Sequence, residues 1–308
     1  VKGTKEISSI TYKDLPHDVS VGGRIMLDDG LISLRIESIT DTDIVCTVEN
    51  DGVIKTKKGV NVPGVHLSMP YMSQRDRDDI IFGAQQGFDF IAASFVRTAQ
   101  DVYDIRNLLN EYDSDIRIIA KIENQTGIDN VEEICEVCSG IMIGRGDLGV
   151  EVPFAELPAI QKYLITKCRL LGKRVITATE MLESMIHNPR PTRAEISDVA
   201  NAVYDGTSAV MLSGESAAGK YPVEAVKAMA EIAEYTEQHT DYKCRFRTTE
   251  FVGESNLDCI SHAVCSMAID VNAKAIVVCS VSGRTAMLVS RFRTPVDIIG
   301  MTTDRKIW

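Results

Sequence analysis

The spacing of apolar residues changes along the chain and divides it into three regions. In residues 1–67, apolar and polar residues alternate in short runs, RIMLDD, LISLRIES and IVCTVEN, which the turn sequences DDG and NDG separate. Alternation with a period of two is typical of strands that bury one face, and such turns join antiparallel neighbours. The pattern therefore predicts a small antiparallel β domain over residues 1–67.

Residues 68–239 alternate between helical and strand patterns. Helices are expected at residues 73–87, 98–112, 126–138, 155–173 and 192–206, with a last one beginning at Pro222. Apolar strands are expected between them, at residues 88–96, 116–123, 140–148, 174–181 and 208–215. Two of the helix starts have the spacing of a capping box, Ser73 with Asp76 and Thr192 with Glu195. Five strands that alternate with helices indicate a parallel sheet covered by helices.

Residues 240–308 contain a second α/β pattern. A helix is expected at 256–270, a strand at 273–281, a helix from Ser282 and a strand at 296–302. We expect this region to be the start of a C-terminal α/β domain that continues beyond Trp308.

Polar or charged residues end each of the five predicted strands in the middle region: Ser94 and Arg97, Lys121 and Glu123, Arg145 and Asp147, Thr177 and Thr179, and Ser213 and Glu215. A (β/α)8 TIM barrel gathers its site from the carboxyl ends of many strands. A doubly wound sheet places its site at one switch point instead. The pattern therefore favours an α/β fold with a TIM barrel over residues 68–239. Because only five strands are present, we expect the first three to precede Val1.

Composition limits the classes of partner. The formal net charge is −11, so we expect no nucleic acid, whose binding depends on clustered Lys and Arg. No run of about 18 apolar residues predicts a membrane span. The eight cysteines are scattered through apolar runs, which favours free thiols in a reducing compartment and a cytoplasmic location.

Two short motifs are interpreted as structural. Cys135 and Cys138 have C-x-x-C spacing, but no second pair or histidines follow at the spacing of a zinc site, so we expect two buried positions of one helix. The sequence GESAAGKY, residues 214–221, fits G-x-x-x-x-G-K but has Tyr221 where a phosphate loop needs Ser or Thr. We therefore expect no nucleotide phosphate loop there.

The clearest candidate chemistry lies in IRIIAKIENQTG, residues 116–127. Lys121 and Glu123 are two residues apart at the end of an apolar strand, so their side chains point to the same side. An ion pair that closes the barrel is one interpretation. The other is a functional pair, because Glu123 and Asp147 end neighbouring strands and two carboxylates, with water and substrate oxygens, suffice for Mg²⁺. A cation beside a lysine suits an anionic substrate such as a phosphate or an enolate.

The turn GRGDLG follows the next strand. Its glycines allow a ligand to approach the backbone closely, and the N–H groups of a short helix starting there would suit a carboxylate or phosphate.

These residues resemble pyruvate kinase. KIENQTG resembles the catalytic-lysine and metal stretch of that family, and GRGDLGVEVP resembles its second metal stretch. The long segment from ATEML to AAGKYP, residues 178–222, follows the family almost continuously, while DDGLIS and KKGVNVPG match its small β domain. The resemblance covers essentially the whole chain. It implies a β-barrel lid domain inserted into the TIM barrel, and phosphoryl transfer from phosphoenolpyruvate to ADP, giving pyruvate and ATP.

The resemblance also implies roles for individual residues. Lys121 would neutralise charge on the transferring phosphoryl group and on the enolate, and Glu123 and Asp147 would ligate Mg²⁺ or Mn²⁺. The substrate-binding backbone at Arg145, Gly146 and Asp147, with the Thr179 hydroxyl, would hold the substrate carboxylate. Thr179 would also be catalytic, on the path that protonates the enolate.

Further implied features lie outside the barrel. Lys58 and Asp28 or Asp29 would belong to a lid over the nucleotide. CSVSGRTA resembles the loop that binds a phosphorylated allosteric effector, with Ser280, Ser282, Gly283, Arg284 and Thr285. An ordinary helix-capping turn is the alternative for this loop, and Val281 stands where members that respond to sugar phosphates often have a polar or basic residue. A homotetramer is implied for the full-length protein.

Two departures from the family pattern limit these expectations. Glu180 stands where the family usually has Gln, which places an additional carboxylate beside the mouth. The potassium site of the family would lie before Val1, so any K⁺ dependence would come from residues outside this chain.

Two other functions compete with the kinase. One is a Mg²⁺-dependent lyase or aldolase that works through a pyruvate enolate, and the other is a non-catalytic sensor of phosphorylated metabolites that uses only the loop near Ser282. Binding of Mg²⁺-ADP discriminates between them, because only the kinase requires it.

Overall fold

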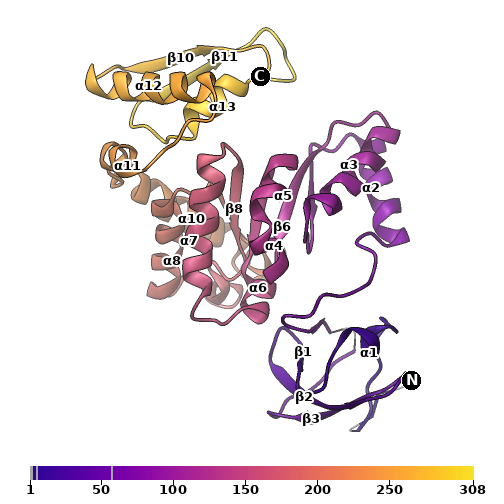
Figure 1. Cartoon of the computed structure of the whole chain (residues 1–308). Coiled ribbons are helices and arrows are strands. Elements are labelled where there is room, and N and C mark those ends of the chain that lie inside the picture. The colour runs from indigo at the N-terminus through magenta and orange to yellow at the C-terminus, as the bar shows by residue number, and fades with distance from the viewer. Residues whose placement is uncertain (1–2, 5, 57) are drawn as a thin grey trace. The chain divides into compact units, whose positions relative to one another are not determined.

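The structure is a computed structural model that describes residues 3–4, 6–56 and 58–308 (Figure 1). The chain divides into two compact units that interleave along the sequence. Unit 1 contains Val1–Arg117, Lys121–Ile134 and Gly144–Leu157, and unit 2 contains Ile118–Ala120, Cys135–Ile143 and Pro158–Trp308.

The N-terminal region forms a four-stranded sheet. Its strands are β1 (Arg24–Leu27), β2 (Ile32–Ile39), β3 (Ile44–Val48) and β4 (Val60–Asn61), in the order β3-β2-β1-β4, and every pair is antiparallel. The buried residues are Leu15 and Val19 at the short helix α1 (Leu15–Asp18), with Ile25, Leu27, Ile32, Ile36 and Val62. The alternating runs therefore form antiparallel strands that bury one face, as the period of two predicts.

The middle region forms a five-stranded sheet in the order β5-β6-β7-β8-β9. The strands are β5 (Phe90–Ala93), β6 (Arg117–Ile122), β7 (Gly140–Gly144), β8 (Arg174–Ala178) and β9 (Ala209–Met211). β8 and β9 are parallel, with Ile176 opposite Ala209. The spatial order equals the sequence order and helices fill each connection, so the predicted parallel sheet is confirmed.

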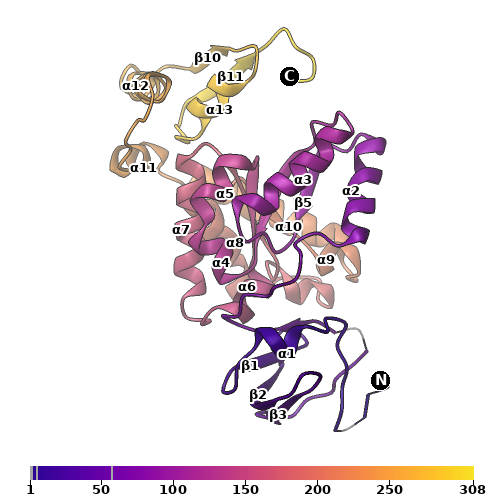
Figure 2. The same cartoon turned by 45° about the vertical axis from the view of Figure 1, so that its right-hand side comes forward.

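Helices connect these strands. They are α2 (Gln74–Gln86), α3 (Ala99–Glu111), α4 (Gln125–Asp129), α5 (Val131–Val137), α6 (Arg145–Glu151), α7 (Leu157–Leu170), the 3₁₀ turn η1 (Glu183–Ile186), α8 (Arg193–Asp205), α9 (Gly214–Ala217) and α10 (Pro222–Gln238). Within unit 2, α8 packs against α10, and the turned view in Figure 2 shows α7 and α10 apart from one another.

Local signals explain most of the helix ends. The capping boxes at Ser73 with Asp76 and at Thr192 with Glu195 are both formed, and Gly87 ends α2 in the left-handed conformation. The helix expected at 126–138 is instead divided into α4 and α5 at Asn130. The Asn130 side chain donates a hydrogen bond to the carbonyl of Arg97, a long-range contact that the sequence pattern does not contain.

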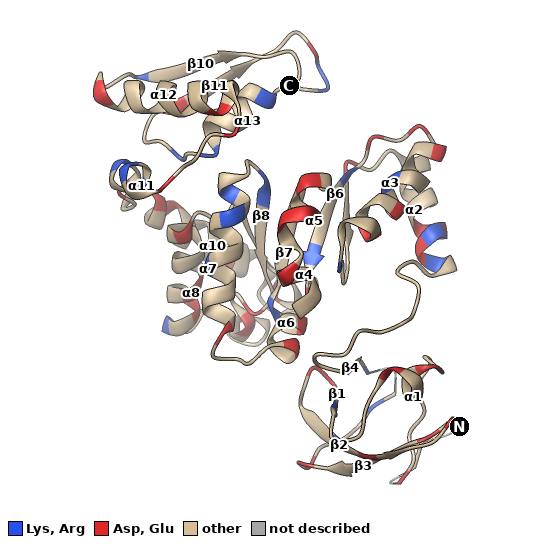
Figure 3. Ribbon diagram, viewed as in Figure 1, with Lys and Arg blue, Asp and Glu red and all other residues tan. Residues whose placement is uncertain are grey.

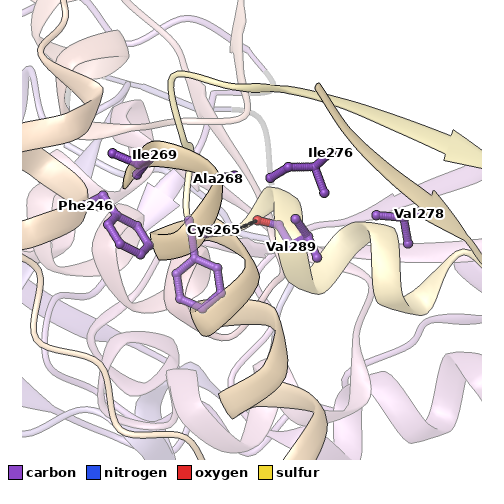
Figure 4. Close-up of a cluster of buried hydrophobic side chains, with 8 residues drawn as sticks. Phe246, Cys265, Ala268, Ile269, Ile276, Val278 and Val289 are labelled. Atoms are coloured by element: carbon purple, nitrogen blue, oxygen red, sulfur yellow. Dashed lines mark hydrogen bonds between the residues drawn. The ribbon is translucent and has the colours of Figure 1, made fainter. Parts of the chain in front are cut away.

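The C-terminal region has its own core. It contains α11 (Tyr242–Thr248), which was not predicted, α12 (Asn256–Asp270), β10 (Ala275–Cys279), α13 (Arg284–Ser290) and β11 (Asp297–Met301). β10 and β11 are parallel, and α12 and α13 pack against them. Figure 4 shows the buried side chains between these elements, where the Cys265 thiol lies 3.6 Å from the carbonyl oxygen of Val289.

No helix in the described part of the chain is both long enough and apolar enough to cross a lipid bilayer.

Candidate functional site

Lys121 and Glu123 lie on one side of the chain at the end of β6, as the period of two predicts. The Lys121 Nζ atom is 2.7 Å from Glu123 Oε1 and donates to Ser94 Oγ at 3.1 Å. The Glu123 side chain is 2% exposed, whereas that of Lys121 is 23% exposed. The Lys121 ammonium group therefore contacts the buried Glu123 carboxylate while remaining partly exposed, so a substrate can reach it.

Two features of neighbouring elements hold the Glu123 carboxylate. Its Oε2 atom accepts a hydrogen bond of 2.9 Å from the backbone N–H of Phe95, which has a positive φ of 52°. On the other side lies Gly144, where a Cβ atom would come within 2.6 Å of both Glu123 Cγ and Oε1. Gly144 has a φ of −84°, so glycine is required here by space rather than by backbone conformation.

Asp147 adds a second carboxylate in the first turn of α6, directly after β7. Burial raises the pKa of Asp147, repulsion from Glu123 raises it further, and Lys121 and a hydrogen bond with the Asn61 side chain lower it. Because Glu123 acts on Asp147 electrostatically, the two predicted ligands are near each other, which is the arrangement expected from adjacent strands.

The two carboxylates fit a divalent cation. Burial and mutual repulsion penalise the charged form of Asp147, and a bound cation would remove that penalty. Among the described residues, no group of three or more His, Cys, Asp and Glu side chains is arranged to hold a metal ion. Mg²⁺ is nonetheless often held by one or two carboxylates, with water and substrate oxygens completing its shell.

The helix α6 begins at Arg145, and Gly144, its N-cap residue, provides no side-chain cap. The first-turn residues Arg145, Gly146 and Asp147 thus have the position that the sequence assigned to them, at the amino end of a helix that follows a strand. Arg145 is 8% exposed. The expected short helix is present.

Thr179 and Glu180 follow β8 in unit 2. Both have positive φ values, 67° and 54°, and such a conformation is rare for a β-branched residue. The Thr179 hydroxyl donates to the carbonyl of Ala178 at 2.6 Å. Two consecutive left-handed residues that are not glycine cost of order 1–3 kcal/mol each and concentrate at functional sites. Glu180 itself is exposed.

The lid candidates also interact. Lys58 forms an ion pair of 2.6 Å with Asp28, and that hydrogen bond and charge raise the pKa of Lys58. Asp28, Asp29 and Gly30 are all left-handed, with φ values of 53°, 56° and 82°. Asp29 also contributes to the raised pKa of Asp147. The DDG turn therefore belongs to the electrostatic surroundings of the carboxylate pair.

Several strand-end residues have structural partners instead. Thr177 is fully buried and its hydroxyl lies 3.0 Å from that of Thr207. Glu215 is fully buried and accepts hydrogen bonds from the backbone N–H groups of Leu182 and Ser213. Thr177 and Glu215 therefore have hydrogen-bond partners within the protein.

Of the two motifs interpreted as structural, the C-x-x-C pair does not share one helix as expected, because α5 ends at Val137, just before Cys138. Cys135 and Cys138 are buried, and Cys168 of α7 lies 3.4 Å from Cys135, sulfur to sulfur. In GESAAGKY, a Cβ atom on Gly219 would lie 2.4 Å from the carbonyl oxygen of Glu215, so the segment folds tightly onto itself.

The loop before α13 is compact. The N–H of Ser280 bonds to the carbonyl of Met301, the N–H of Arg284 approaches Ser282 Oγ at 3.4 Å, and Gly283 is left-handed. The structure records no side-chain cap on α13. Val281 is 76% exposed.

Two contributors to the site escaped sequence reasoning. Asn61, whose side chain lowers the pKa of Asp147, comes from β4 of the N-terminal sheet. The backbone N–H of residue 95 donates to Glu123, and this contact does not depend on the phenylalanine side chain at that position. Neither contact has a sequence signal, because one crosses between separate sheets and the other uses only the backbone.

Comparison with known proteins gives two family matches. The model of the barrel domain of pyruvate kinase matches residues 1–226, and the model of the alpha/beta domain of pyruvate kinase matches residues 258–308.

Individual relatives agree with these matches. Pyruvate kinase of Geobacillus stearothermophilus is 53% identical over 311 residues, covering 100% of this chain and 53% of the relative. Pyruvate kinase of Staphylococcus aureus is 52% identical over 99% of the chain, and that of Clostridium acetobutylicum is 48% identical over 97% of the chain and 64% of its own length. The chain spans about half the length of most curated relatives that it matches.

Proposed function

Because the chain belongs to the pyruvate kinase family, we propose that the protein containing it transfers the phosphoryl group of phosphoenolpyruvate to ADP, giving pyruvate and ATP. The observation that supports this most directly is the cluster at the end of β6, where Lys121 contacts both Glu123 and Ser94 and lies in the field of Asp147. A buried carboxylate, a second carboxylate and a partly exposed ammonium group together suit a polyanionic substrate.

Lys121 is the charge-stabilising residue of this proposal. Its ammonium group is held at 2.7 Å from Glu123 and 3.1 Å from Ser94, so its position is fixed before substrate arrives. A preorganised cation stabilises charge that develops on the transferring phosphoryl group and on the enolate oxygen, without reorganising during the reaction.

Glu123 and Asp147 would hold Mg²⁺ or Mn²⁺. When bound, the cation would neutralise phosphate and enolate charge beside Lys121. The Phe95 N–H and the close backbone of Gly144 keep the Glu123 carboxylate in one place, and the Asn61 side chain favours the charged form of Asp147 by lowering its pKa. A site with two protein carboxylates leaves coordination positions for substrate oxygens, which agrees with the preference of Mg²⁺.

The substrate carboxylate would bind at the amino end of α6. The backbone of Arg145, Gly146 and Asp147 and the Thr179 hydroxyl are the groups proposed to hold it, and Thr179 would lie on the path that protonates the enolate. The strained left-handed backbone at Thr179 supports a functional role for this residue. Its hydroxyl donates to the Ala178 carbonyl in this structure, so it would have to rotate to donate to the substrate carboxylate.

The remaining family features are also proposed. Residues 1–67 form the lid, with Asp28 and Lys58 near the nucleotide, residues 68–239 supply the last five strands of a TIM barrel, and residues 240–308 begin the C-terminal domain. We propose that the other three strands, and any K⁺ site, come from outside this chain. The protein would be a cytoplasmic homotetramer, and the loop from Ser280 to Thr285 would bind a phosphorylated effector.

The test is a matched pair of lysine substitutions in the protein that contains this chain. Lys121→Met removes the ammonium group and should lower pyruvate formation from phosphoenolpyruvate and Mg²⁺-ADP by about 10²-fold or more. Lys227→Met, at an exposed position of α10, is the control and should leave turnover unchanged. Near-normal turnover of Lys121→Met would refute the assignment.

The lyase or aldolase alternative predicts a different substrate requirement. Such an enzyme needs the enolate and the cation but no nucleotide, so its turnover should not depend on ADP. A rate that rises with Mg²⁺-ADP and saturates supports the kinase.

A further inference from the structure

Three arginine side chains converge in unit 2, away from the carboxylate pair. Arg169 lies in the last turn of α7, Arg245 lies in α11, and Arg293 follows α13. A Cβ atom on Gly206, which ends α8, would lie 3.0 Å from Arg245 Nη1 and 3.1 Å from Arg169 Cδ. Gly206 therefore marks the point where two of these side chains meet. Figure 3 shows the basic residues that α11 contributes.

The hydrogen-bonding capacity of this arginine cluster (Arg169, Arg245 and Arg293) is largely unused. Arg169 is 6% exposed, and its Nε is a buried donor that has no acceptor among the described residues. Both Nη atoms of Arg245 are buried without an acceptor in the same part of the chain. Unsatisfied buried donors cost about 1–3 kcal/mol each, and more when charged, so such groups call for a ligand or another explanation.

The local charges do not balance. Burial, followed by repulsion from Arg245 and then Arg293, lowers the pKa of Arg169 to about 10, and burial and Arg293 lower the pKa of Arg245. These groups stay cationic at neutral pH, since even a pKa near 10 leaves the guanidinium protonated. The repulsion is therefore not relieved by loss of a proton.

One carboxylate is near the cluster. Asp205 attracts Arg245, but its Oδ1 is already 2.5 Å from Lys162 Nζ. Its Oδ2 is a buried acceptor without a partner among the described residues, so a small side-chain shift could pair it with Arg245. That pair would still leave Arg169 and Arg293 without a counter-charge. Asp205 alone therefore does not neutralise the cluster.

From this geometry we infer that Arg169, Arg245 and Arg293 form a binding site for a phosphate group, either inorganic phosphate or the phosphate of a small monoester. Guanidinium groups donate in pairs to phosphate oxygens, and a tetrahedral dianion can accept from three directions at once. Arg293 is partly exposed and bonds weakly to Ser208 Oγ at 3.4 Å, which provides an open side for entry.

The position of the site gives it a consequence for the fold. Its three side chains come from the end of α7, from α11 and from the segment after α13, all within unit 2. A bound phosphate would attract the three guanidinium groups, which repel one another when no anion lies between them. It would thereby tie residues 240–308 to the helices that flank β8, and it would stabilise the folded state by mass action.

The test is binding of inorganic phosphate at constant ionic strength, with chloride as the replacement anion. Equilibrium dialysis of labelled phosphate should give one more bound phosphate in the unaltered protein than in Arg169→Gln, in which affinity at this site should fall at least tenfold. Arg247→Gln is the matched control, since Arg247 lies on the same helix as Arg245 but is exposed and paired with Asp270. It should bind as the unaltered protein does.

A second measurement separates a binding site from a purely structural cluster. In phosphate-free buffer Arg169→Gln should melt at the same temperature as the unaltered protein or higher, because repulsion and a buried donor are removed. Phosphate should raise the melting temperature of the unaltered protein and of Arg247→Gln, and should raise that of Arg169→Gln less. Arg245→Gln, at a partly buried position, repeats the test if Arg169→Gln does not fold.

Competition with glycerol 3-phosphate identifies the source of the phosphate group. Displacement of labelled phosphate from the site lost in Arg169→Gln indicates a monoester, and no displacement indicates the free ion. Equal phosphate binding by the unaltered protein and by both cluster variants would overturn the inference. Phosphoryl transfer is not measured, so this result is independent of the proposed activity.

Discussion

Replacing Gly144 by alanine tests whether the position of the Glu123 carboxylate determines the activity. The new methyl group would lie 2.6 Å from both Glu123 Cγ and Oε1, whereas ordinary van der Waals contact begins near 3.4 Å. The carboxylate must therefore move by about 0.8 Å, or the strands must separate. The backbone at Gly144 has a negative φ, so the substitution adds steric overlap without backbone strain.

The displacement has no easy direction. Glu123 is 2% exposed, its Oε2 bonds to the Phe95 N–H, and its Oε1 contacts Lys121, so motion breaks at least one of these contacts. Overpacking of this kind costs about 1–3 kcal/mol of stability. A shift of about 1 Å in a catalytic group costs about 10²-fold in rate. We expect Gly144→Ala to remain folded, to bind Mn²⁺ weakly and to lose about 10²-fold in kcat/KM.

Gly149→Ala, in the helix α6 that Gly144 precedes, is the matched control. Its Cβ atom would meet Leu157 Cδ2 at 3.6 Å, an ordinary contact. Steady-state pyruvate formation, Mn²⁺ titration and thermal unfolding should be measured on both variants. If Gly144→Ala and Gly149→Ala give the same kcat/KM and the same Mn²⁺ affinity, the close packing of Gly144 does not position the carboxylate, and the reasoning fails.

Three further predictions concern the metal site, a helix cap and the sheet edges. Glu123→Ala and Asp147→Ala should each abolish most Mn²⁺ binding in the presence of substrate, and the double variant should lose little more; additive losses by titration would indicate two unrelated carboxylates. Asp258→Asn should cost at least about 1 kcal/mol at pH 7, because it weakens the hydrogen bond from the Ser255 hydroxyl and the ion pair with Arg291, both of which lower the pKa of Asp258. A carboxyl group whose pKa is lower in the folded state than in the unfolded state stabilises the fold at pH values above the unfolded-state pKa. The difference in the free energy of unfolding between the unaltered protein and Asp258→Asn should therefore disappear as the pH falls through the folded-state pKa. A difference in urea unfolding that persists at pH 2 would contradict this. Residues 1–308 alone should form no pyruvate and should self-associate, because the five-stranded sheet ends on β5 and β9; a monodisperse, active sample by light scattering and assay would contradict both expectations.

The sequence by itself determined the features that depend on near neighbours. Capping boxes at Ser73 and Thr192 place helix starts because their hydrogen bonds join residues three positions apart. The alternation of apolar strands and helices predicts the order of the five-stranded sheet, since each crossover returns the chain beside its last strand. Lys121 and Glu123 share a side because strand side chains repeat every two residues.

The tertiary structure decided the features that depend on distant residues. Asn130 separates α4 from α5 in a stretch that looks like one helix in the sequence, and its side chain donates to the carbonyl of Arg97. Glu215 resembles a site residue in the sequence, but its carboxylate is fully buried between two backbone N–H groups. Asn61 reaches Asp147 from another sheet, and Arg169 and Arg245 meet over Gly206 although they are far apart along the chain. Periodicity describes which way one element faces, whereas these contacts depend on how separate elements pack, and only the folded chain brings them together.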